Sequence, residues 1–297
     1  MQDFNTYPSP HGHSPTPHPH GLAGDLQTLI RTAPDRRSVL RWLTLGSVAP
    51  LGLMACGGGG DSDPVATNTS SGQTTSTTAS GTCSAIPSET GGPYPGDGTN
   101  NNASGIANAL TLSGIVRSDI RSSIAGASAV AGGVPLTVTL KLVNTGASCA
   151  SLAGYAVYLW HCTREGGYSM YSSGITAENY LRGVQVSDSN GEVSFTTIVP
   201  GCYSGRWPHI HFEVFSSLTA ATTLPAGDAV RTSQLALPKA ICDTVYATSG
   251  YEASVSNLAA ISLASDNVFG NDSAALQMAV VTGSVATGYA ASLTVGV

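Results

Sequence analysis

Two histidines separated by one residue, His209 and His211, are the first candidates for chemistry in this sequence. Ile210 and Phe212 alternate with them, and apolar alternation with a period of two predicts a half-buried β-strand. Successive side chains of a strand point to opposite faces, so both imidazoles share one face, with Cα atoms roughly 6.5 to 7 Å apart. Two imidazoles at this spacing can bind one metal ion. The alternative is a pair of hydrogen-bonded histidines on an edge strand.

A third candidate, Tyr203, stands before His209, beyond Ser204 and Gly205. Ser and Gly favour turns, so the phenol can fold back toward the imidazoles. The chain has seven histidines, and some lie in a segment that we expect to be removed: His11, His13, His18 and His20. His161 lies on an apolar strand outside the pattern and is interpreted as structural.

The N-terminal region has the features of an export signal. Residues 1–34 are rich in Pro, His, Gly and Ser and show no apolar periodicity. Arg36 and Arg37 then precede the apolar run 42–55, which is too short to span a bilayer. We therefore predict a disordered n-region and a twin-arginine export signal over residues 1–55.

The sequence Leu53-Met54-Ala55-Cys56 resembles a bacterial lipobox, in which the chain is cut before the cysteine and the thiol receives lipid. A plain signal peptide with an incidental cysteine is the alternative. Residues 57–82 are mostly Gly, Ser, Thr, Asp and Asn, a composition typical of flexible linkers. We predict lipid attachment at Cys56, a tether over residues 56–82, and a location on the periplasmic or extracellular face of a bacterial membrane.

Charge and cysteine usage exclude several function classes. The formal net charge is −6, with 12 Lys and Arg against 18 Asp and Glu. Such a chain lacks a basic surface for phosphate backbones, so nucleic acid is not an expected partner. The cysteines beyond the tether are Cys83, Cys149, Cys162, Cys202 and Cys242, with no C-x-x-C pair for a zinc ribbon. Outside the cytoplasm we expect them to pair, leaving one thiol over, with the connectivity open.

Residues 83–297 are expected to form one domain. Short apolar segments predict strands over 110–116, 136–142, 156–160, 193–198, 209–215, 234–237, 278–281 and 290–297. The sequence Asp188-Ser189-Asn190-Gly191 is typical of a hairpin turn. A helix is indicated only around 258–264. The pattern predicts an all-β fold, a β-sandwich of mostly antiparallel strands with few short helices.

Three sequence stretches carry a family resemblance. Trp160 is followed eight residues later by Tyr168, then come Thr197-Ile198-Val199-Pro200-Gly201-Cys202-Tyr203 and Arg206-Trp207-Pro208-His209-Ile210-His211. In these the chain resembles the intradiol ring-cleavage dioxygenases, which open catechols with a non-haem ferric iron. The stretches Ile86–Tyr94 and Gly288–Ala290 are also family-like, so the likeness covers most of residues 83–297.

The resemblance implies a site and a reaction. It implies that one Fe3+ per chain is held by Tyr168, Tyr203, His209 and His211, and that Arg206 and Gln234 lie in the substrate pocket. It implies an enzyme that uses O2 to cleave a catechol-type ring between its two hydroxylated carbons, giving a muconate-type diacid. Tyr203 is the ligand that the substrate is expected to displace. Arg206 would stabilise the anionic catecholate.

The chemistry of the implied ligands agrees with this metal. A phenol has a free pKa of about 10 and binds a metal well only when the ion displaces its proton. A hard trivalent cation does so better than zinc. Two phenolates with two neutral imidazoles therefore favour ferric iron over softer or divalent ions.

Two departures from the family limit what the resemblance implies. The loop between Tyr203 and His209 is shorter than in the soluble catechol and protocatechuate dioxygenases, which indicates a more open pocket and leaves the substrate unassigned. The N-terminal helical region that dimerises some catechol dioxygenases has no counterpart, which leaves the oligomeric state open.

Other interpretations use the same residues. A cupin-like metal site would need a carboxylate near the histidines, but Glu213 lies about 13 Å along the strand from His209. The two tyrosines can instead sit at the rim of a sandwich, and Arg206 and Arg182 can pair with surface carboxylates. The alternative function is a non-catalytic, lipid-tethered β-sandwich that binds a ligand at the cell surface. A third interpretation keeps the iron without turnover.

Overall fold

The computed structural model describes residues 83–223 and 229–297. The predicted export signal over residues 1–55, the predicted lipid-attachment residue Cys56 and the tether over 56–82 lie outside the described residues, so they stay predictions. Within the described part of the chain, no helix has the length and apolar character needed to cross a bilayer.

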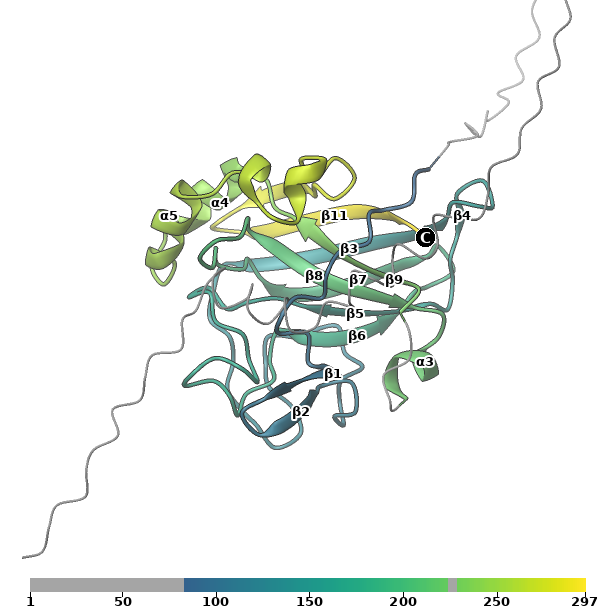
Figure 1. Cartoon of the computed structure of the whole chain (residues 1–297), viewed down its shortest axis with the longest axis horizontal. Helices are drawn as coiled ribbons and strands as arrows, with labels where there is room; N and C mark the ends of the chain where they lie inside the picture. Colours follow the sequence, from purple (N-terminus) through teal and green to yellow (C-terminus); the bar gives the residue numbers. More distant parts are fainter. Residues whose placement is uncertain (1–82, 224–228) are drawn as a thin grey trace, which may run out of the picture. The chain divides into compact units, whose positions relative to one another are not determined.

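Two β-sheets form the body of the protein (Figure 1). One has four strands in the order β6-β5-β8-β9, all antiparallel, and the other has five, in the order β10-β11-β3-β4 with β7 also paired to β3. The strands are β3 (Pro135–Asn144), β4 (Ala150–Ser151), β5 (Ala156–Trp160), β6 (Arg182–Val186), β7 (Glu192–Ile198), β8 (His209–Phe215), β9 (Arg231–Ala236), β10 (Val280–Ser284) and β11 (Gly288–Gly296). The predicted fold class, an all-β sandwich, is confirmed.

Short elements complete the fold. A separate hairpin consists of β1 (Asp97–Asn102) and β2 (Gly105–Asn108). The helical segments are α3 (Leu218–Thr222), α4 (Lys239–Tyr246), α5 (Glu252–Ala259), η2 (Leu263–Ser265) and η3 (Phe269–Asn271). Figure 1 shows β3 and β11 on one side of β8 and β9, and the β1–β2 hairpin on the other side.

The core lies between the two sheets. On β3, the alternating residues Leu136, Val138, Leu140 and Leu142 are buried and belong to one apolar cluster with the inner residues of β5 and β8. Their neighbours along the strand, such as Thr137 and Thr139, are more exposed. The strict alternation in the sequence therefore corresponds to a strand with one core face and one solvent face.

The prediction that the His209 strand is half-buried is wrong. All seven residues of β8 are buried. The outer face of β8 is covered because the segment before β1 crosses the four-stranded sheet. Gln234 on β9 donates from Nε2 to the Thr90 carbonyl at 2.8 Å, and the Tyr158 hydroxyl on β5 donates to the Pro95 carbonyl at 2.7 Å. The covering segment lies far from β8 in sequence, so the strand's own alternation could not reveal it.

Two turns were misassigned from sequence. Residues 110–116 form successive turns and not a strand, closed by hydrogen bonds such as Leu112 N to the Ala109 carbonyl at 3.0 Å. The Asp188–Gly191 turn leads from β6 to β7, which belong to different sheets, so it does not form a hairpin. Turn residues predict where the chain reverses direction. They do not predict whether the two strands beside the turn pair with each other.

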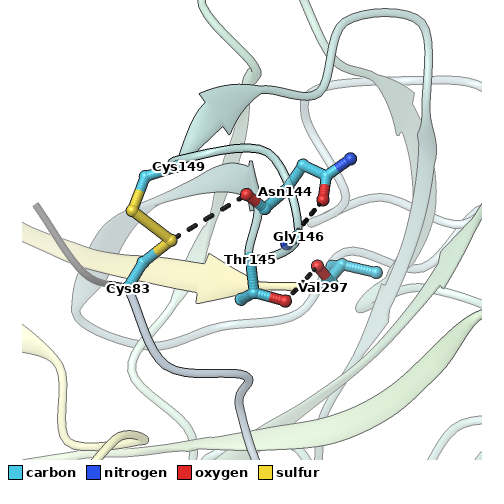
Figure 2. The surroundings of a disulfide bond; sticks show 6 residues. All are labelled: Cys83, Asn144, Thr145, Gly146, Cys149 and Val297. Carbon is cyan, nitrogen blue, oxygen red and sulfur yellow. Dashed lines mark hydrogen bonds between the residues drawn. A yellow bond between two sulfur atoms is a disulfide. The ribbon is translucent and has the colours of Figure 1, made fainter. Parts of the chain in front are cut away.

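A single disulfide joins Cys83 to Cys149 among the described residues, with Cα atoms 5.7 Å apart (Figure 2). It lies beside Thr145, whose backbone N–H and hydroxyl donate to the carbonyl of Val297 at 2.9 and 3.0 Å. The disulfide therefore fastens the start of the described chain next to its last residue.

The other cysteines of the described chain are free, which contradicts the expectation that only one thiol is left over. Cys162, Cys202 and Cys242 are buried. The sulfur of Cys162 lies 3.3 Å from the Gly201 carbonyl oxygen, and that of Cys202 lies 3.3 Å from the Arg206 carbonyl oxygen. The packing of the core sets the positions of these three cysteines, and their spacing in sequence does not predict which of them come close enough to pair.

Replacing both Cys83 and Cys149 with serine is expected to lower the free energy of unfolding by about 4 kcal/mol, because the disulfide closes a long loop in the unfolded chain. The two cysteines are 66 residues apart. Urea denaturation measures the change. Reduction of the unsubstituted protein should reproduce it, and an unchanged midpoint in both samples would contradict the prediction.

Candidate functional site

The four side chains predicted to bind metal come together on the outer face of the four-stranded sheet. Nε2 of His209 lies 3.0 Å from Nε2 of His211. The ring centroid of Tyr203 is 5.8 Å from that of His209, and the Tyr168 centroid is 6.4 Å from that of His211. The two phenol rings meet edge to face with centroids 5.8 Å apart. The phenols come from turns after β5 and β7, and the imidazoles from β8.

The strand register places the imidazoles beside an aromatic wall. His211 is opposite Trp160 on β5 and opposite Gln234 on β9. The Trp160 ring stacks on the His211 ring, with centroids 4.9 Å apart and planes inclined by 5°. Trp160 is fully buried. A flat, rigid wall of this kind restricts His211 to one ring orientation.

The hydrogen bonds of His209 fix its tautomer. Its Nδ1 lies 2.5 Å from the carbonyl oxygen of Trp207. A carbonyl only accepts, so Nδ1 carries the proton and Nε2 presents a lone pair toward His211. Metal-binding histidines characteristically donate their other ring N–H to a carbonyl or carboxylate in this way.

Both imidazoles are neutral near pH 7. Burial is the main cause, and with the positive charge of Arg206 it lowers the pKa of His209 to about 3. Burial, His209 and Arg206 likewise hold the pKa of His211 well below its usual value. Neutral imidazole is the form that binds a metal.

A glycine allows the two phenol-bearing turns to pack together. Gly166 has a φ of +88°, and a Cβ added there would lie 3.2 Å from Cβ of Tyr203. Two residues later, the backbone N–H of Tyr168 donates to the Ser172 hydroxyl at 2.9 Å. A side chain at position 166 would strain the backbone and push the two turns apart.

Arg206 is buried beside the tyrosines and does not pair with a surface carboxylate. Its Nε donates to Oδ2 of Asp266 at 2.9 Å, and its Nη2 donates to Oε1 of Gln234 at 2.7 Å. Burial by itself would lower the pKa of the guanidinium, but the Tyr203 phenol and the Asp266 carboxylate outweigh burial, and the pKa is raised. Arg206 therefore stays cationic at the site.

Asp266 is a residue of the site that the sequence analysis missed. It is 3 % exposed and accepts four hydrogen bonds, from Nε of Arg206 and from the backbone N–H groups of Trp207, Val268 and Phe269. Burial would raise the pKa of this carboxyl, but Arg206 and these donors lower it. Asp266 lies 60 positions after Arg206 in sequence, and no local pattern marks it.

Gln234 connects Arg206 to the segment that covers the sheet. Its side chain is fully buried, with Oε1 accepting from Arg206 and Nε2 donating to the Thr90 carbonyl. Both the oxygen and the nitrogen of the side-chain amide are hydrogen-bonded, so in this structure Gln234 orients Arg206. Its predicted contact with a substrate stays a prediction.

The donor set fits a hard metal ion. Within residues 83–223 and 229–297, no three His, Cys, Asp or Glu side chains gather around a common point, so a metal would need the phenols as well as His209 and His211. A distance of 3.0 Å between the two Nε2 atoms suits two nitrogens that each lie about 2.1 Å from one ion, at roughly a right angle. Phenolate oxygens beside neutral imidazoles suit a hard, highly charged cation.

His161 lies outside the set of four. Its Nδ1 is 2.8 Å from the Cys162 carbonyl oxygen and its Nε2 is 2.7 Å from Oγ1 of Thr197, so both ring nitrogens are hydrogen-bonded. These contacts agree with the structural role expected from the sequence.

His161 should make the protein sensitive to acid. Burial lowers the pKa of its imidazole to about 4, whereas the unfolded value is about 6.5. Between these pH values the unfolded chain binds more protons, so stability rises with pH in this window and is lost as pH falls. Replacing His161 with Gln should make the loss of unfolding free energy between pH 7 and pH 4 smaller by about 3 kcal/mol. Urea denaturation at both pH values tests this, and equal losses in the two proteins would contradict it.

Comparisons with known proteins concern the family and the fold. A family model described as Dioxygenase matches residues 122–226. The intradiol ring-cleavage dioxygenase from Tetranychus urticae has a similar fold, with a TM-score of 0.55 and 24% sequence identity, over 72% of this chain and 94% of that chain. A second dioxygenase crystal structure is 23% identical, with a TM-score of 0.54 over the same shares of the two chains. No curated protein matches the chain.

The segment that matches the family model contains both tyrosines, both histidines and Arg206. At these identities the solved structures show a shared fold and assign no role to any residue of this chain. Their roles as metal ligands stay predictions. The sequence motifs, the family match and the fold together confirm that this chain resembles the intradiol ring-cleavage dioxygenases.

Proposed function

We propose that the protein is a non-haem ferric-iron dioxygenase that cleaves a catechol-type ring between its two hydroxylated carbons with O2, giving a muconate-type diacid. The observation that supports this best is the convergence of two phenols on two neutral imidazoles whose Nε2 atoms are 3.0 Å apart. Tyr168, Tyr203, His209 and His211 would hold one Fe3+ per chain. A bound ferric ion would supply Lewis acidity and an electron acceptor for the catechol and O2.

The side chains around the proposed ion have separate roles. The Nδ1 bond of His209 to the Trp207 carbonyl holds its lone pair in place, and the Trp160 ring does the same for the plane of His211. When a catechol binds and takes the place of Tyr203, Oη of the released Tyr203 phenolate would take the proton of one catechol hydroxyl. The proton then leaves the substrate oxygen without entering bulk water.

Arg206 would stabilise negative charge on the substrate. The guanidinium is always protonated at neutral pH, and here it is buried, so its charge is weakly screened. Asp266 and Gln234 fix its orientation before a ligand arrives. A fixed cation next to Tyr203 needs no rearrangement as charge develops on the catecholate.

We also propose that the protein is exported by the twin-arginine route and anchored at a membrane through lipid on Cys56. The Cys83–Cys149 disulfide supports an oxidising compartment, where such bonds persist. Mass spectrometry of the membrane fraction would test the lipid, and an unmodified Cys56 in that fraction would contradict it.

The function is tested by colour and by oxygen consumption. Iron-loaded protein should show the broad visible absorption of tyrosinate bound to ferric iron, and should consume O2 with catechol, hydroxyquinol or protocatechuate. Absence of the band in an iron-replete sample would contradict the proposal and favour a non-catalytic binding module. A band without oxygen uptake across the panel would indicate an iron protein that has lost turnover.

A further inference from the structure

We infer that Arg182 is a positioning residue that holds the Tyr168 phenol in place against the two histidines. This inference rests on the proposed function. Arg182, the first residue of β6, is 1 % exposed. All of its N–H donors are used: Nε bonds Oγ of Ser169, Nη1 bonds the Pro95 carbonyl and the Tyr158 hydroxyl, and Nη2 bonds the Tyr94 and Ser169 carbonyls.

The first set of bonds fixes the backbone next to Tyr168. Arg182 donates to both the hydroxyl and the carbonyl oxygen of Ser169, at 3.1 and 3.0 Å. Ser169 directly follows Tyr168, and its hydroxyl donates in turn to the Tyr180 carbonyl at 2.7 Å. The planar guanidinium therefore holds the peptide between Tyr168 and Ser169 in place, and with it the backbone that carries the Tyr168 side chain.

The second set fixes the ring that packs on Tyr168. Arg182 donates to the carbonyls of Tyr94 and Pro95, at 2.9 and 2.5 Å. The Tyr94 ring lies 4.9 Å from the Tyr168 ring, centroid to centroid. One guanidinium thus holds both the turn that carries the Tyr168 phenol and the aromatic ring beside it.

This arrangement is costly for the fold, which is why we assign it a role in the site. No ion pair among residues 83–223 and 229–297 includes Arg182, and burying a cation without a counterion is expensive. Met170 and Leu181 also adopt left-handed backbone, with φ of 71° and 58°. Strained residues of this kind persist where the surroundings impose them, and they concentrate at functional sites.

Arg117 provides a matched control. It is also an arginine that bonds backbone carbonyls, those of Ser122, Asn179 and Arg182. None of these acceptors belongs to the Tyr168 turn or to the Tyr94 segment. Arg117 bonds Arg182 only through the backbone carbonyl, whereas the bonds that hold Ser169 and Tyr94 come from the Arg182 side chain. Loss of Arg117 should therefore weaken the fold and leave the five bonds of the Arg182 side chain in place.

The test compares Arg182→Met, Arg182→Lys and Arg117→Met by titrating each apoprotein with Fe3+ and following the visible tyrosinate band, with thermal unfolding as a check of folding. We expect Arg182→Met to bind Fe3+ about 10- to 100-fold more weakly than the unsubstituted protein and to shift the band. Arg182→Lys keeps the charge but not the planar set of donors, so its shift should be nearly as large. Arg117→Met should lower the unfolding temperature and keep both affinity and band.

Several results would overturn the inference. An unchanged band and affinity in Arg182→Met, with only a lower unfolding temperature, would leave Arg182 a structural residue. A full rescue by Arg182→Lys would assign the effect to charge and not to the hydrogen bonds. If Arg182→Met does not fold, Ser169→Ala removes one acceptor of Arg182, and an unchanged band there would also count against it. Absence of the band in the unsubstituted protein would instead contradict the proposed function.

Discussion

Replacing His211 with alanine should leave a folded protein that neither retains iron nor consumes O2. His211 supplies one of the two imidazole nitrogens that face each other at 3.0 Å. Among the described residues, no group of three His, Cys, Asp or Glu side chains could bind the metal in its place. The loss should exceed the roughly 10- to 100-fold that follows removal of an outer partner of a metal ligand. Iron content per chain, circular dichroism and an oxygen electrode measure the three expectations.

Two further variants make the His211 result specific. Replacing Tyr168 with Phe removes one phenol oxygen and keeps the ring that packs on Tyr94, so the visible band should change strongly while the sandwich stays folded. Replacing His161 with Gln alters a buried histidine outside the site and should keep iron. Normal iron content in His211→Ala, or loss of iron in His161→Gln, would disprove the assignment of the ligands.

Replacing Asp266 with alanine should strongly lower both stability and turnover. The change leaves the Arg206 guanidinium buried without its carboxylate, and breaking a buried ion pair on one side costs about 3 to 5 kcal/mol. It also removes the acceptor for three backbone N–H groups. Arg206 is then held only through Gln234, so turnover should fall as well. Urea denaturation and initial rates of oxygen uptake give the two quantities.

An asparagine at position 266 separates these two effects. Its amide oxygen can still accept from Val268 and Phe269, but it has no charge to pair with Arg206. We expect Asp266→Asn to recover part of the stability lost by Asp266→Ala while its turnover stays low. Full turnover in Asp266→Asn would contradict a role for the carboxylate in holding Arg206.

The parts of the molecule that could be predicted from sequence depend on neighbours along the chain. Alternation over residues 136–142 predicted β3 because that strand has one core face and one solvent face. The apolar residues 156–160 predicted β5, which is buried on both faces. The spacing of His209 and His211 predicted a shared face for the same reason. The Ser204-Gly205 turn brings Tyr203 back to the imidazoles as expected.

The parts that could not be predicted depend on segments that meet only in the fold. Asp266 completes the environment of Arg206 from a distant loop. Arg182, for which a surface carboxylate was one alternative partner, bonds carbonyls of residues that lie before and after β5 in the chain. The face of β8 that carries the histidines is buried by the stretch around Thr90. Sequence patterns report the face that a residue occupies but not the segment that covers that face.

Because the cysteines differ in burial, the disulfides that an oxidant forms depend on whether the chain has already folded. In the folded domain Cys83 and Cys149 lie partly at the surface, whereas Cys162, Cys202 and Cys242 are enclosed. Burial raises the pKa of the Cys202 and Cys242 thiols to about 12, so they hold little of the reactive thiolate. Among the cysteines of residues 83–297, a chain oxidised after folding therefore has one available pairing. A chain oxidised while still extended would expose every thiol to exchange and would form mispaired products that block the core from closing.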